Sequence, residues 1–260
     1  MIEPYWSKNG ITIYCADNRE VLPQLGSFDL ALTDPPYGIG ADARQRNRAG
    51  KQHGKAEAPS KNYDLLLTDP PYGIGESLRN HDNCKYMSKV SPVVEYEKSD
   101  WDNQPPSRKI LNAFRALATS QIIFGGNYFW LPPTLCWLVW DKLNGSNDYA
   151  DCELAWTNLK KAVRRLQYRW HGMIHDGNDV RYHPTQKPLA VMQWCIRQAP
   201  KDVKTILDPW MGVGTTLCAT KLTGLQAVGI EQSEEYCKIA IQRLGGPVAK
   251  PKPGGFGLCK

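Results

Sequence analysis

The chain has 260 residues, a formal net charge of +6 and an apolar fraction of 42%, which suits one sizeable domain with a single hydrophobic core. It holds no stretch of about 20 apolar residues and its first residues lack the pattern of a secretory signal, so we expect neither a membrane span nor export. The eight cysteines and five histidines contain no CxxC pair and lack the spacing typical of metal-binding residues. We therefore expect reduced thiols, no metal site and a cytoplasmic protein.

In the first part of the chain, short apolar runs alternate with polar stretches. Residues 18–25 indicate a helical turn. Residues 41–62 are basic and without periodicity, and we expect a mobile loop there. Residues 76–106 are polar and are expected to be irregular. Three apolar runs predict strands, at residues 11–15, 28–33 and 63–68.

The second part reads as regular alternation of helices and strands. Residues 107–118 predict a helix capped by Ser107, and residues 233–244 predict a last helix capped by Ser233. Two further helices are predicted at 187–199 and 215–223. Apolar runs predict strands at 120–124, 135–142, 152–159, 203–208 and 226–231. Uninterrupted apolar strands between helices indicate an α/β sandwich with a mostly parallel sheet.

Residues 206–216 (ILDPWMGVGTT) place a glycine-bearing loop between a strand and a helix, and the next strand ends at Glu231. This layout is typical of nucleotide binding at the carboxyl edge of a parallel sheet. A lone GxG also occurs in tight turns. Leu217 stands where a dinucleotide fingerprint has its third glycine, so the pattern favours an adenosine-bearing ligand such as S-adenosylmethionine.

The sequence DPPY offers a different chemistry. Two prolines stiffen the turn and donate no N–H, so the carboxylate and a proline carbonyl form a small rim of acceptors. Such a rim can accept both hydrogens of an exocyclic amino group, while the tyrosine ring stacks on the base. Accepting both hydrogens makes the amino nitrogen more nucleophilic and orients it. The alternative is a rigid stop at the end of a strand.

Together these motifs resemble the DNA amino-methyltransferases, which methylate adenine N6 or cytosine N4. Residues 34–37 and 69–72 are similar to their catalytic DPPY, and residues 208–216 to their cofactor loop, with Trp210 in place of the usual Phe. Residues 183–188 (HPTQKP) resemble the segment beside the methionine part of the cofactor. The catalytic motif precedes the cofactor loop, as in the circularly permuted β group of the family. The resemblance implies a Rossmann-like methyltransferase sandwich over residues 1–243 as one domain, followed by a flexible tail, 244–260.

The resemblance also implies roles for individual residues. The catalytic residues would be Asp34, Pro35, Pro36 and Tyr37, or in the second copy Asp69, Pro70, Pro71 and Tyr72. The cofactor-binding residues would be Asp17, His183, Thr185, Lys187, Asp208, Trp210, Gly212, Gly214, Thr215 and Glu231. Among these, Asp17 would lie near the cofactor's adenine and Glu231 would accept from its ribose.

Clustered positive charge suits a polyanion, although any one basic run can be a solvated surface. Residues 157–182, where the family has its target-recognition region, interleave bases with aromatic residues. The candidate DNA-binding residues are Arg44, Arg46, Arg48, Lys160, Lys161, Arg164, Arg165 and Arg169. A base inside a duplex is unreachable, so double-stranded DNA would have to be bound with the target base flipped out. So short a recognition region predicts a short target sequence or help from a second subunit in a homodimer.

The motif is duplicated: residues 29–40 (DLALTDPPYGIG) and 64–75 (DLLLTDPPYGIG) agree at all but one position. A parallel sheet has one strand position opposite the cofactor loop, so only one copy can face the cofactor. The first copy has the shorter connection from the helix at 18–25, and the sequence favours Asp34 and Tyr37 for that reason. The second copy has the shorter connection to residues 99–106 (SDWDNQPP), and near identity makes an exchange between copies conceivable.

Three functions are compatible with the motifs. A DNA methyltransferase, bacterial or phage-encoded and free-standing or part of a restriction-modification system, fits best. Asp at the first motif position favours adenine N6 over cytosine N4. A methyltransferase acting on RNA or on a protein glutamine would use the same rim, but usually places its cofactor loop first. A relic that binds cofactor and DNA, inactivated by the duplication, is the third.

Overall fold

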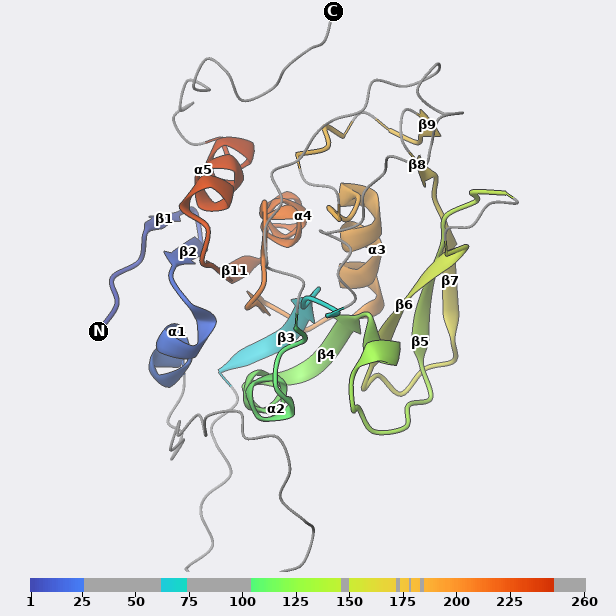
Figure 1. Cartoon of the computed structure of the whole chain (residues 1–260), viewed down its shortest axis with the longest axis horizontal. Coiled ribbons are helices and arrows are strands. Elements are labelled where there is room, and N and C mark those ends of the chain that lie inside the picture. The colour runs from blue at the N-terminus through green and yellow to red at the C-terminus, as the bar shows by residue number, and fades with distance from the viewer. Residues whose placement is uncertain are drawn as a thin grey trace, which may run out of the picture.

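The computed structural model describes residues 1–25, 62–73, 104–145, 150–171, 174–177, 179–182 and 185–245. Within them a nine-stranded sheet, ordered β1-β2-β11-β10-β3-β4-β6-β5-β7, carries helices on both faces (Figure 1). The strands of this sheet are β1 (Trp6–Lys8), β2 (Ile11–Cys15), β3 (Tyr63–Thr68), β4 (Ala118–Phe124), β5 (Trp137–Asp141), β6 (Cys152–Thr157), β7 (Arg164–Gln167), β10 (Thr205–Asp208) and β11 (Gln226–Glu231). A separate hairpin pairs β8 (Trp170–His171) with β9 (Ile174–His175). The helices are α1 (Asn18–Leu25), α2 (Arg108–Ala116), the 3-10 turn η4 (Gly126–Tyr128), α3 (Leu189–Gln198), α4 (Thr215–Thr223) and α5 (Glu234–Arg243).

The centre of the sheet is parallel, which confirms the predicted fold class. β2, β11, β10, β3 and β4 run in one direction. β6 is antiparallel to both of its neighbours, β4 and β5, and β1 is antiparallel to β2 at the opposite edge. The carboxyl ends of the five parallel strands therefore meet along one edge, where ligands bind in open α/β sheets.

Two apolar layers sandwich the sheet. Side chains of α3, α4 and α5 pack on one face and those of α1 and α2 on the other (Figure 1). Along β3 the burial alternates, with Leu65 and Leu67 in the first layer and Leu66 in the second, and all three are fully buried. This alternation is what a strand covered on both faces requires.

Polar contacts at both ends fix the position of β3 beside β10. The Asp64 carboxylate accepts hydrogen bonds from the backbone N–H groups of Lys204 and Thr205, both at 2.9 Å. At the other end the Thr68 hydroxyl donates to Asp208 at 2.7 Å. A slip of one residue would break both contacts and move each of these leucines into the opposite apolar layer.

The predicted helix caps are present. Ser107 Oγ accepts from Ile110 N and Ser233 Oγ accepts from Tyr236 N, each at 3.3 Å. The helix predicted over 107–118 is shorter than expected, because Ala118 pairs with Tyr63 as the first residue of β4.

The two ends of the long connection between α1 and β3 lie close together. The Asn62 side-chain amide donates to the carbonyl of Leu25, so α1 and β3 are adjacent across residues 26–61. Since loop-closure entropy grows slowly with length, a short connection is a weak reason to prefer the first copy. That copy, residues 29–40, lies outside the described residues, as do the basic loop and the tail from 246.

Among the described helices none is both long and apolar enough to cross a bilayer. The same residues hold no group of three or more His, Cys, Asp or Glu side chains placed to bind a metal ion.

Candidate active site

A cavity of about 950 Å³ opens at the carboxyl edge of the parallel strands. Its wall combines the loops after β2, β3, β10 and β11 with the start of α2 and the segment before α3. Asp69 and Pro71 line it together with Gly212 and Glu231. The two motifs singled out in the sequence therefore share one cavity, at the upper end of the size range for small-molecule sites.

Glu231, the last residue of β11, holds the glycine loop. Its two carboxylate oxygens accept from Gly212 N at 3.2 Å and from Ser233 N at 2.8 Å. Burial raises the pKa of Glu231, and the backbone hydrogen bonds oppose that rise. Each oxygen has further acceptor capacity, so the carboxylate can also receive ribose hydroxyls. Gly212 has a φ of +51° and a Cβ there would meet nothing within 4 Å, which leaves space for a ligand against the backbone.

Gly214 has a packing role and is not part of the cavity wall. Its φ is +75°, and a Cβ would come within 2.7 Å of the Ala240 Cβ on α5. This glycine therefore allows α4 to begin close to α5. Thr215 lies on the wall, and its hydroxyl accepts from Arg243 Nη1 at 3.0 Å.

Asp208 and Trp210 form the floor beside β10. Asp208 is only 2% exposed, and burial raises its pKa to about 6 despite hydrogen bonds from Thr216, Thr68 and the N–H of Trp210. The Trp210 ring packs edge-on against Phe114 of α2, with centroids 5.3 Å apart. The unusual tryptophan is therefore supported from behind as an aromatic wall.

Asp17 and Thr185, two residues predicted to bind the cofactor, also line the cavity. The Asp17 carboxylate pairs with the Arg19 guanidinium, and this hydrogen bonding, against the effect of burial, lowers the pKa of Asp17. His183 lies outside the described residues.

The second DPPY motif ends β3 at the cavity. The Tyr72 hydroxyl donates to Asp69 at 2.7 Å, and its ring stacks on Tyr128 of η4 with centroids 4.8 Å apart. Gly125 makes this possible, since a Cβ at that position would fall 2.1 Å from the Tyr72 ring. This supporting loop was not predicted from the sequence, although the pair of glycines at 125–126 was a signal for a close approach of another side chain.

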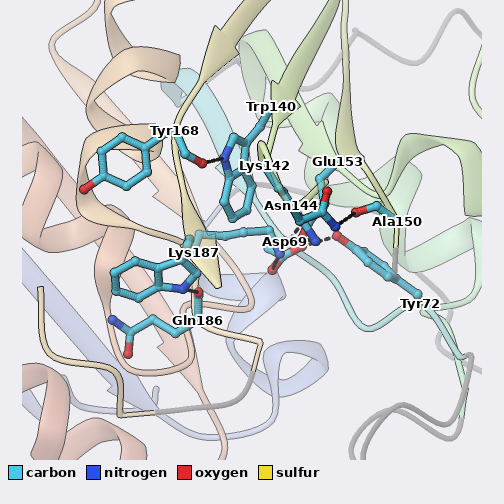
Figure 2. A network of polar contacts seen from close by, with 11 residues as sticks. Asp69, Tyr72, Trp140, Lys142, Asn144, Ala150, Glu153, Tyr168, Gln186 and Lys187 are labelled. Carbon is cyan, nitrogen blue, oxygen red and sulfur yellow. Dashed lines mark hydrogen bonds and ion pairs between the residues drawn. The ribbon is translucent and has the colours of Figure 1, made fainter. Parts of the chain in front are cut away.

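Lys187, predicted to bind the cofactor, lines the cavity and also contacts the acceptor rim. Its ammonium contacts the carboxylates of Asp69 and Glu153, the latter at 3.1 Å (Figure 2). Glu153, on β6, was also missed. The sequence feature that could have indicated Glu153 is the single acidic residue in the mostly apolar strand CELAWT.

The predicted DNA-binding residues that the structure describes do not gather at the cavity. α3 starts beside the cavity and ends at Gln198, whose carbonyl accepts from Lys161 Nζ. A ten-residue helix is about 15 Å long, so Lys161 and its neighbour Lys160 lie towards the opposite end of the sheet. Arg169 is at the cavity end of the β7 region, paired with Asp176 at 3.2 Å. Arg164 and Arg165 lie on the edge strand β7, and Arg44, Arg46 and Arg48 lie outside the described residues.

A family model described as DNA methylase (N6_N4_Mtase) matches residues 86–242. The chain belongs to this DNA methylase family. Among curated relatives, the Type II methyltransferase M2.DpnII of Streptococcus pneumoniae is 35% identical over 106 residues, covering 40% of this chain and 35% of that protein. The Type II methyltransferase M.HindIII of Haemophilus influenzae is 40% identical over 67 residues, covering 26% and 22%. The chain thus spans about a third or less of the length of these relatives.

Among solved structures, the PvuII DNA methyltransferase (cytosine-N4-specific) aligns with 93% of this chain and 88% of its own. Its TM-score is 0.50 at 13% sequence identity. This likeness concerns the fold, and it agrees with the mostly parallel sheet described above.

Proposed function

We propose that this protein transfers a methyl group from S-adenosylmethionine to the exocyclic amino group of a base in DNA. The observation that carries the proposal is the shared cavity, in which Asp69 of the acceptor rim and Glu231 with the glycine loop line one continuous space. A cofactor held at the loop and an amino group held at the rim would lie side by side. Such proximity is the main requirement for a direct transfer.

The residues of the cavity fit the cofactor. Gly212 leaves open space over its Cα, Trp210 offers an aromatic wall, and Glu231 retains acceptor capacity for ribose hydroxyls. When bound, S-adenosylmethionine supplies an electrophilic methyl group on a sulfonium that leaves as a neutral thioether.

The protein's part in the chemistry falls to Asp69 and Pro70. The Asp69 carboxylate and the Pro70 carbonyl accept the two amino N–H groups and turn the nitrogen's electron pair towards the methyl group. The nitrogen becomes positively charged as the N–C bond forms, and it then releases one proton. Asp69, already hydrogen-bonded to one N–H, is placed to receive that proton.

We further propose that the second copy of the motif is the working one. β10 has a neighbour on each side, β11 and β3, and β3 consists of residues 63–68. The strand position opposite the cofactor loop is therefore taken by the second copy. Asp69 would then face the cofactor in place of Asp34, and Tyr72, hydrogen-bonded to Asp69, would take the place of Tyr37.

Adenine N6 is the acceptor that we propose, on the basis of the Asp at the first motif position. The stacked pair Tyr72 and Tyr128 gives a flipped base an aromatic surface beside the rim. Trp130, two residues after η4, is 83% exposed, and we propose that it adds a further aromatic side chain on this side of the site. Exposed aromatic side chains at such a rim suit stacking on bases.

The test is methyl transfer from labelled S-adenosylmethionine to unmethylated genomic DNA, with the product nucleoside identified by mass. Wild type, Asp34→Ala and Asp69→Ala are compared, and cofactor binding is measured for each by calorimetry. We expect N6-methyladenine with wild type and with Asp34→Ala, and loss of transfer with Asp69→Ala while cofactor still binds. N4-methylcytosine would overturn the choice of base, and loss with Asp34→Ala alone would overturn the choice of copy.

A wild-type protein that binds the cofactor but methylates no DNA would refute the proposed activity. RNA and a glutamine-containing protein extract, offered in parallel, would then separate another acceptor from an inactivated relic.

A further inference from the structure

Four charged side chains of alternating sign contact one another in a row (Figure 2), which begins at Asp69 on the cavity wall. Asp69 contacts Lys187, Lys187 contacts Glu153 at 3.1 Å, and Glu153 contacts Lys142 at 2.8 Å. The Lys187 side chain is 7% exposed, and the other three are each 22% exposed. The four residues come from four different segments: the end of β3, the end of β5, β6 and the residues before α3.

The network matters because the proposed chemistry needs an ionised carboxylate in a buried place. A protonated Asp69 would donate with one oxygen, and the rim would lose acceptor capacity. Burial raises the pKa of Asp69, Lys187 opposes that rise, and Glu153 adds to it. Lys187 is thus the positive charge that makes ionisation of Asp69 tolerable.

Lys187 is itself held firmly in the charged form. Burial alone would lower its pKa, but the charges of Asp69 and Glu153 outweigh burial and raise it. The ammonium also lies over the rings of Phe124 and Tyr72, at 5.3 Å and 5.7 Å from their centroids. Two carboxylates and two ring faces therefore contact the ammonium of a residue that also lines the cavity.

Glu153 is tied to Lys187 and to a second lysine. Burial alone would raise the pKa of Glu153, but the charges of Lys187 and Lys142 outweigh it and lower the value to about 2. Glu153 is therefore a fixed anion. Among the described residues, the ionisable groups near Lys187 and Asp69 on the packed elements are Tyr72, Tyr128, Lys142, Glu153, Cys195 and Asp208.

Resting on the proposed function, we infer that Lys187 and Glu153 are positioning residues for methyl transfer: Glu153 anchors the Lys187 ammonium, which in turn keeps the Asp69 carboxylate ionised and aimed at the cavity. The segment TQKP would then serve the acceptor rim as well as the cofactor side. Glu153 belongs to none of the motifs identified in the sequence.

The test compares the pH dependence of kcat for wild type, Lys187→Met, Lys187→Arg and the double variant Lys187→Met/Glu153→Gln. Removing an opposite charge this close moves a carboxyl pKa by about 1–3 units. We expect the acidic limb of the Lys187→Met profile to move up by about that amount, with the KM for S-adenosylmethionine unchanged. The double variant removes one charge of each sign, so its acidic limb is expected to lie between those of Lys187→Met and wild type. The acidic limb of Lys187→Arg is expected to lie close to that of wild type.

The matched control is the exposed ion pair Lys238–Glu234, 3.0 Å apart with side chains 50% and 59% exposed. Lys238→Met and Lys238→Met/Glu234→Gln are expected to leave the pH profile where it is. A raised KM for S-adenosylmethionine in Lys187→Met, with an unmoved acidic limb and no gain from Glu153→Gln, would refute the inference and make Lys187 a cofactor ligand.

An unfolding experiment separates this inference from the proposed function. Without Lys187, two buried acids face each other and their pKa values rise, so stability is lost as pH increases through those raised values. The urea midpoint of Lys187→Met is expected to be lower at pH 8 than at pH 5, and the double variant to show less of this difference. If wild type methylates no DNA, the proposed function is refuted. The inferred role of Lys187 and Glu153 is refuted if the urea midpoints of the two variants change equally with pH.

Discussion

The single position at which the two motif copies differ makes a quantitative prediction about which copy occupies the sheet. Leu66 of the second copy corresponds to Ala31 of the first. Leu66 is fully buried in the layer between the sheet and helices α1 and α2. Replacing a buried Leu by Ala costs about 3–5 kcal/mol, because transfer free energy is lost and a cavity remains. The second copy therefore has an advantage of roughly a hundredfold or more at this strand position.

The perturbation is Leu66→Ala, which gives the second strand the core sequence of the first. We expect the free energy of unfolding in urea to fall by about 3 kcal/mol or more. Leu222→Ala serves as the control, because that side chain is 63% exposed on α4 and should change stability by less than about 0.5 kcal/mol. A loss with Leu66→Ala as small as that of the control would refute the reasoning.

The double variant Ala31→Leu/Leu66→Ala tests whether the copies can exchange. If the first strand can take the vacated position, stability returns, and methyl transfer becomes sensitive to Asp34→Ala in place of Asp69→Ala. If it cannot, the double variant stays as unstable as Leu66→Ala alone.

Single contacts give three further predictions. Gly214→Ala should lower the free energy of unfolding in urea by about 2–4 kcal/mol, because the strain of a left-handed backbone adds to the close contact with Ala240. Gly224→Ala is the control, since Gly224 has a φ of +72° and a Cβ there would meet nothing within 4 Å, and it should cost only about 1 kcal/mol. Equal losses would show that packing against Ala240 plays no part. Burial raises the pKa of Asp208 to about 6 from 3.8, so its contribution is full below about pH 4 and lost as pH rises through 6. Relative to wild type, the free energy of unfolding of Asp208→Asn should therefore rise by about 2 kcal/mol between pH 4 and pH 7, and a constant difference across this window would contradict the assignment. Trp130→Ala should weaken DNA binding, measured by fluorescence anisotropy, by about 1–3 kcal/mol without changing the unfolding midpoint, whereas unchanged binding would remove Trp130 from the DNA surface.

Local rules in the sequence determined much of this protein. Ser107 and Ser233 cap helices because a hydroxyl before a helical run satisfies a free N–H. Gly224 ends α4 because it adopts a positive φ without strain. The order of strand, glycine loop, helix and strand up to Glu231 placed the cofactor side of the cavity, since parallel strands end at a common edge.

The roles of Gly214 and Lys187 depended on contacts far along the chain. Gly214 fits against Ala240, and Lys187 pairs with Asp69, which lies more than a hundred positions earlier. No spacing within a motif encodes such pairs. The sequence could therefore mark both residues as belonging to the site, while their partners had to come from the fold.

The choice between the two DPPY copies was beyond the sequence for a related reason. The Asp and Thr residues that hold β3 against β10 are the same in both copies, as is DPPY. Local chemistry therefore could not separate the copies, and connection length pointed to the first. Only the tertiary structure shows that Leu25 and Asn62 meet across the long connection, and that the one differing side chain, Leu66, fills a buried layer where Ala31 would leave a cavity.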